Sequence, residues 1–208
     1  QIGPRTEVTP EERDAAKHAA DRQRDELKIW FAEGEWELNA PKILETQQGK
    51  LLFDDYQPRE DGLIEIHPCS MVFLATDKPG EADDADRRQR AIVLRAPQGA
   101  VLKFDTFDLK HAAVGKLIGG ELHGEVYVHS SQRSPGPEDD LEITTRDVLL
   151  NETEITTAHS MEFRLGAHFG RGQGVRIQLD TAEEAGKSPQ IRGAKSITLY
   201  EQVFMHMA

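Results

Sequence analysis

The feature that most constrains this chain is a repeated alternation of apolar and polar residues between Gly120 and Asp180. In the first repeat, Leu122, Gly124, Val126 and Val128 fall on one parity and polar residues fall on the other. The same pattern recurs in 155–165 and 175–180. A period of two places alternate side chains on opposite faces of a β-strand. Three such strands predict an antiparallel sheet with one apolar and one polar face, and the apolar face requires a cover.

The charge balance limits the classes of partner. The chain has 208 residues, with 25 Lys plus Arg against 37 Asp plus Glu, for a formal charge of −12. Binding to nucleic-acid phosphates requires a basic surface, so a nucleic-acid partner is not expected. The same balance does not favour direct adsorption to anionic lipid headgroups. The single cysteine, Cys69, excludes an internal disulfide and is predicted to be a small buried side chain.

No apolar run has the length of about 18 residues that a membrane helix needs. The chain opens without a charged-then-apolar signal segment. Gln1 to Pro4 resembles a cut end, which is compatible with a removed signal or membrane anchor.

The N-terminal region predicts a helix. Thr9 is the candidate N-cap, Pro10 suits the first helical position and Glu12 completes a capping box. The helix should run to about Phe31 and dock through its apolar end; a polar stalk that leads to a membrane anchor is the alternative. We therefore divide the chain into residues 1–32, an N-terminal helix and linker, and residues 33–208, a β-domain.

The rest of the β-domain also reads as short strands separated by turn residues. Polar loops are predicted at 77–90, 130–140 and 183–189. Asp54 to Pro58 reads as a turn. The other predicted strands are 36–41 at a sheet edge, 49–53, 63–66, 71–74, 91–97, 100–105, 141–151 with a kink, and 197–205 with a bulge near Glu201.

No catalytic constellation stands out. Ser70, Ser130 and Ser160 lack the glycines of a nucleophile elbow, and the histidines lack metal-ligand spacing. We therefore expect no enzymatic activity, no metal and no cofactor. The glycine-rich run 166–174 precedes a strand pattern and not a helix, so it predicts a tight corner, with Arg171 as a possible phosphate contact.

The order of these segments resembles the OstA-like periplasmic proteins of lipopolysaccharide export, of the LptA and LptC types. The likeness covers residues 91–180 best. It is carried by Leu122-x-Gly124-x-Val126-x-Val128, a polar loop, Ile143-Thr144-Thr145-Arg146-Asp147-Val148-Leu149-Leu150, Ile155-Thr156-Thr157 and Val175-x-Ile177, followed by the corner at 170–174.

The resemblance implies an all-β fold: an open antiparallel β-jelly roll of two facing sheets and stacked hairpins, here with an N-terminal helix. It implies a periplasmic protein, and the LptC type adds a tether to the inner membrane by an anchor outside this chain. Its partners would be lipopolysaccharide or a related glycolipid, with acyl chains between the sheets, and other β-jelly-roll export proteins joined by edge-strand pairing. The chain departs from a minimal module by extra residues before Ala91 and after Asp180.

In this interpretation the alternating apolar residues line a lipid-binding groove. The protein would then be a non-enzymatic scaffold in lipopolysaccharide transport, which is part of outer-membrane biogenesis. The alternative is a structural or carbohydrate-facing β-module in which the same residues form a closed core. The predicted groove residues are Leu122, Val126, Val128, Ile143, Ile155, Met161, Phe163, Leu165, Val175 and Ile177.

Overall fold

The structure is a computed structural model that describes residues 10–46, 49–59, 62–74, 91–108, 113–130, 140–182 and 190–207. The predicted loops at 77–90 and 183–189, and residues 131–139 of the loop predicted at 130–140, lie outside these ranges. The chain divides into two compact units, residues 1–41 and residues 42–208, and each is described by itself.

The first unit contains helix α1 (Pro10–Leu27) and the short 3₁₀ helix η1 (Trp36–Leu38). The predicted N-terminal helix is confirmed, and Leu27, Trp30 and Phe31 at its end are buried. The predicted strand at 36–41 is wrong. The N–H of Leu38 donates to the carbonyl of Glu35, at an N···O distance of 3.1 Å, so the backbone closes an i→i+3 turn. Ala40 then adopts a positive φ of 56°, which is incompatible with a strand.

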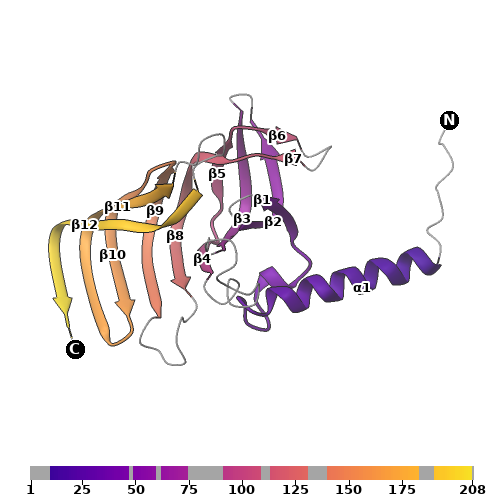
Figure 1. Cartoon of the computed structure of the whole chain (residues 1–208), viewed down its shortest axis with the longest axis horizontal. Helices are drawn as coiled ribbons and strands as arrows, with labels where there is room; N and C mark the ends of the chain where they lie inside the picture. Colours follow the sequence, from indigo (N-terminus) through magenta and orange to yellow (C-terminus); the bar gives the residue numbers. More distant parts are fainter. Residues whose placement is uncertain are drawn as a thin grey trace. The chain divides into compact units, whose positions relative to one another are not determined.

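The second unit is an antiparallel β-structure, as the alternation predicted. Ten strands form one sheet, in the order β1-β2-β3-β4-β8-β9-β10-β11-β12, with β5 paired to β3 and β8; β6 and β7 form a separate two-stranded ribbon (Figure 1). The strands are β1 (Lys42–Thr46), β2 (Gly49–Pro58), β3 (Leu63–Phe73), β4 (Ile92–Ala96), β5 (Ala100–Phe104), β6 (Phe107–Asp108), β7 (Ala113–Val114), β8 (Leu117–Ser130), β9 (Leu141–Asn151), β10 (Glu154–Leu165), β11 (His168–Ala182) and β12 (Gln190–His206).

Two strands are longer than predicted. β2 continues through the expected turn at 54–58, because that segment pairs in register with residues 64–67 of β3. β3 is a single strand that passes through Pro68, where two strands were predicted. It pairs with β5 before Pro68 and with β4 after it, so the proline lies where the strand changes partner. Turn-forming residues are therefore overridden here by ladder pairing.

A line of backbone irregularities crosses the five long strands β8 to β12, which bend as they run side by side (Figure 1). We call it the bulge line. Each strand has a register shift or a residue with positive φ at this level, and bulges of this kind bend a sheet. Its members are Gly124 (φ 65°), Asp147 (φ 43°), the shift between Thr157 and Ser160, Gly174 (φ 66°) and Gln202 (φ 49°).

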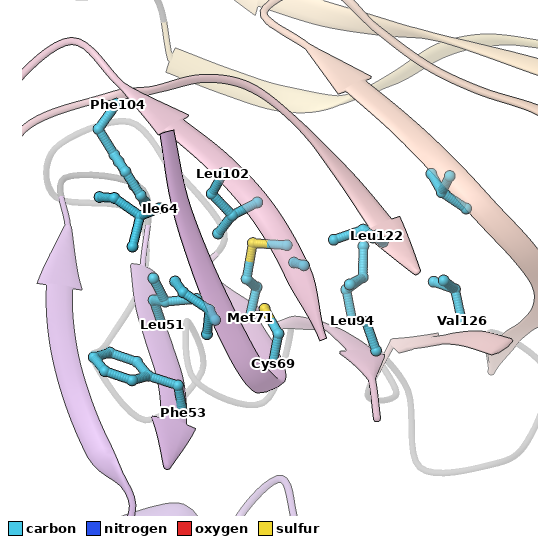
Figure 2. Packing of buried hydrophobic residues seen from close by; sticks show 14 residues of the cluster. Leu51, Phe53, Ile64, Cys69, Met71, Leu94, Leu102, Phe104, Leu122 and Val126 are labelled. Atoms are coloured by element: carbon cyan, nitrogen blue, oxygen red, sulfur yellow. The ribbon is translucent and has the colours of Figure 1, made fainter. Parts of the chain in front are cut away.

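The main core lies on strands β2 to β9. This first cluster contains fourteen buried side chains, among them Phe53, Leu102, Leu122 and Val126 at no more than 1% exposure. Figure 2 shows them converging from neighbouring strands. Phe104 and Leu117 also line a small cavity together with Leu51 and Met71. This half of the sheet therefore has a closed apolar interior.

Candidate functional site: the two faces of strands β9 to β12

The apolar face continues past the main core but is less well covered. Among the residues whose burial is described, the second cluster has three buried members, Ile143, Met161 and Val175, with Phe163 and Ile177 among the half-buried residues packed on it. Val175 and Ile177 lie on one side of the bulge line, and the other three lie on the opposite side. One apolar cluster therefore spans the bend.

The predicted groove residues fall on this apolar face, but their burial differs. Leu122 and Val126 belong to the closed first cluster. Val128, Ile155, Phe163 and Ile177 are half-buried, and Leu165 is 43% exposed. The set therefore grades from packed core at β8 to solvent-exposed surface at the end of β10.

Side chains on β9 and β10 fix the bulge line. The carboxylate of Asp147 accepts a hydrogen bond from the N–H of Gly124 at 2.7 Å, and its other oxygen lies 3.2 Å from Nε2 of His159. The hydroxyl of Thr157 donates to the carbonyl of Arg146 at 2.7 Å, and that of Thr145 donates to Ser160 at 3.0 Å. Both threonines are buried, and these bonds satisfy hydroxyl groups whose burial without a partner would destabilise the fold.

The glycine-rich run has two roles. Gly166 has φ 58° and lies in the turn that joins β10 to β11, so the predicted tight corner is confirmed at that residue. Gly170 and Gly172 instead lie within β11. A Cβ placed on Gly170 would lie 2.5 Å from the Phe163 ring, and one on Gly172 would lie 3.0 Å from Leu199. Both glycines leave room for apolar side chains of neighbouring strands.

The opposite, polar face of β9 to β12 holds a pocket of about 490 Å³. We call it the polar-face pocket. Cross-strand pairing places Glu142 beside Arg164 and Glu162 beside Arg171. Thr144, Phe163, Phe169, Gly170 and Phe204 complete its lining. Arg171 was predicted as a ligand contact from the sequence, whereas the rest of the pocket was not, since it depends on the register between four strands.

The edge strand β12 exposes apolar side chains. Tyr200, Val203, Phe204 and Met205 are each between 51% and 55% exposed. β12 stands at the end of the strand order and pairs with β11 along its other side. Native sheets usually protect such edges with charges or short strands. The last part of this 17-residue edge strand, with its exposed apolar side chains, is therefore a candidate surface for pairing with another strand.

The remaining chemistry is sparse. Burial raises the pKa of the fully buried Cys69 thiol to about 12, which keeps it protonated and unreactive at neutral pH. Among the described residues, no group of three or more His, Cys, Asp or Glu side chains could hold a metal ion. Within the same ranges, no helix has the length and apolar character needed to cross a membrane.

Fold and site together define a β-protein with a graded apolar face and an exposed edge strand. No protein-family model matches the chain, and no curated protein matches it.

Proposed function

We propose that the protein is a non-enzymatic periplasmic scaffold in lipopolysaccharide transport to the outer membrane, and that its two sheet layers form an open β-jelly roll that holds acyl chains. The observation that carries the proposal is the incomplete cover of the second cluster, which has three buried members against fourteen in the first within the part of the chain that the structure describes. A lipid chain laid on Phe163, Leu165 and Ile177 would complete the burial of these side chains.

The energetics of such binding require no catalytic group. Each buried methylene of an acyl chain contributes about 0.8 kcal/mol, so one chain on this face supplies enough free energy for firm binding. The bulge line supports the open jelly roll, because bent strands allow both halves of the apolar face to contact one ligand. The gradient from buried Met161 to exposed Leu165 would let a chain enter at the end of β10.

Partners of the same fold fit the edge strand. Pairing of β12 with an edge strand of another β-jelly-roll protein would satisfy backbone groups and cover Val203 and Met205. Repeated edge pairing would extend the apolar face from one protein to the next. The expected location, a periplasm with a possible inner-membrane tether, belongs to the same proposal.

A photo-crosslinking amino acid at position 163 tests the cargo. In intact envelopes it should label lipopolysaccharide, because the half-buried Phe163 lies on the apolar face. The same probe at Tyr127 is the matched control, since that residue is 38% exposed on the polar face. Equal labelling of glycolipid from both positions, or none from position 163, would contradict the proposal.

A structural or carbohydrate-facing β-module remains the second candidate. The closed first cluster favours it, because Phe53, Leu102 and Leu122 are fully packed with no space for a ligand among them. If this function is correct, lipid should not protect the second cluster, and purified protein should be equally stable with and without glycolipid.

A further inference from the structure

The polar-face pocket combines three kinds of side chain in a definite order. Its aromatic wall stands on β11 and β12, where the rings of Phe169 and Phe204 lie 6.3 Å apart and Phe169 stacks on His206 at 4.9 Å. Its carboxylates stand on β9 and β10, at Glu142 and Glu162. The two arginines lie between the aromatic and the acidic sides.

The arginines are not committed to these carboxylates. Arg164 and Arg171 are cross-strand neighbours of Glu142 and Glu162, yet neither forms an ion pair with any residue that the structure describes. Arg176 on the same strand β11 does pair with a glutamate, at 3.3 Å from Glu154. The guanidinium of Arg171 lies 5.9 Å from the centroid of the Phe204 ring instead. Its hydrogen-bond donors therefore remain available to a ligand.

From this order we infer that the polar-face pocket binds a sugar ring that carries a phosphate. Arginines bind phosphate oxygens through charge-assisted hydrogen bonds. Glutamates accept hydrogen bonds from hydroxyl groups, and an aromatic ring packs against the apolar side of a sugar ring. Inorganic phosphate alone fits poorly, because the two carboxylates repel a ligand that presents only negative charge. The volume of about 490 Å³ is within the range of small-molecule sites.

The inference does not depend on the lipid proposal, because the arginines, glutamates and aromatic rings that carry it lie on the face opposite to the second cluster, and Phe163 alone belongs to both sites. Calorimetric titration with glucose 6-phosphate tests it, with glucose and inorganic phosphate as single-feature probes. We expect saturable binding of glucose 6-phosphate that is at least about tenfold tighter than binding of either probe, from the combined charge and ring contacts. Equal affinity for phosphate, or no heat with glucose 6-phosphate, would overturn it.

Substitutions locate the site. Arg171→Gln and Arg164→Gln should each weaken glucose 6-phosphate binding by about tenfold or more, as expected for a lost charge-assisted bond. Arg146→Gln is the control. Arg146 lies on β9 and is exposed like the other two arginines, but it does not line the pocket. All three residues are exposed, so the variants should fold. An equal loss in the control would overturn the assignment.

A further arm separates a free ligand from a lipid headgroup. Octyl glucoside 6-phosphate carries the same anionic sugar on an alkyl chain. Affinity equal to that of glucose 6-phosphate supports a free ligand. Tighter binding that Ile177→Asp, a change in the second cluster outside the pocket, returns to the level of glucose 6-phosphate supports a headgroup whose chain reaches the second cluster. If the affinity of both compounds is the same for the wild-type protein and for Arg171→Gln, the inference is overturned and the lipid proposal is untouched.

Discussion

Individual residues on β8 and β9 differ mainly in which face of the sheet they occupy. Leu122 is fully buried in the first cluster, whereas Leu149 of the neighbouring strand is 54% exposed. Both are leucines in regular ladder positions, and their β-propensity is the same. The difference in burial should therefore decide how much the removal of each side chain lowers the free energy of unfolding.

Leu122→Ala should lower the free energy of unfolding by about 2–5 kcal/mol, from lost burial and the cavity left behind. Leu149→Ala, the matched control, should change it by no more than about 0.5 kcal/mol. Urea denaturation of both variants measures the two values. Similar losses would mean that the first cluster is not the packed core described above.

Cys69 offers a chemical measure of the same packing. Burial raises the pKa of its thiol to about 12, so the native protein should react very slowly with a thiol reagent at pH 8. The unfolded protein should react at once. Because the folded pKa is above the unfolded one, the thiol stabilises the fold below about pH 9 and this contribution decreases as pH rises toward 12. Rapid labelling of the native thiol would show an open core.

Strands β8 to β12 act as long elements divided by the bulge line. Asp147 is central to it, because its carboxylate holds the N–H of Gly124 on one strand and His159 on another. Its positive φ of 43° is tolerated better by Asp and Asn than by most residues. A kink in this strand was predicted from sequence.

Asp147→Ala should destabilise the protein by about 1–3 kcal/mol, because the part-buried N–H of Gly124 loses its acceptor. Asp147→Asn keeps an acceptor oxygen and tolerance of positive φ, so it should cost less than the alanine substitution. Thermal or urea unfolding compares the two. If Asn is as harmful as Ala, the contact of the carboxylate with His159 and not the bond to Gly124 stabilises the bulge.

The β12 edge should promote association. We expect the protein to self-associate at high concentration, because an exposed apolar edge strand favours intermolecular pairing. Val203→Lys with Met205→Lys should shift the population to monomers in sedimentation velocity. Leu149→Lys, which adds charge at an equally exposed site away from the edge, should leave association unchanged. Wild-type protein that stays monomeric at every concentration would contradict this expectation.

For the molecule as a whole, the local alternation was sufficient to predict an antiparallel β-structure, and the capping residues at 9–12 were sufficient to predict the N-terminal helix. A bulge near Glu201 was also predicted, and it occurs at Gln202. The strand predicted at 36–41 was wrong because so short an alternation of apolar and polar residues cannot distinguish a strand from a 3₁₀ turn.

The polar-face pocket could not be predicted from the sequence, for a different reason. Its lining residues come from four strands, and their proximity is decided by register: Thr144 faces Glu162, which faces Arg171, which faces Phe204. Each residue alone resembles an ordinary exposed side chain. The division of the apolar face into a closed first cluster and a partly open second cluster depends on strand order in the same way.

The central claim is that the second cluster receives an acyl chain, and a spin label tests it most directly. Cys69 is buried and unreactive, so a nitroxide can be attached selectively to a cysteine at position 163 or, as the control, at position 127. Addition of lipopolysaccharide should immobilise the label at 163 and leave the one at 127 mobile. Unchanged spectra at 163, at concentrations that saturate any binding, would contradict the claim.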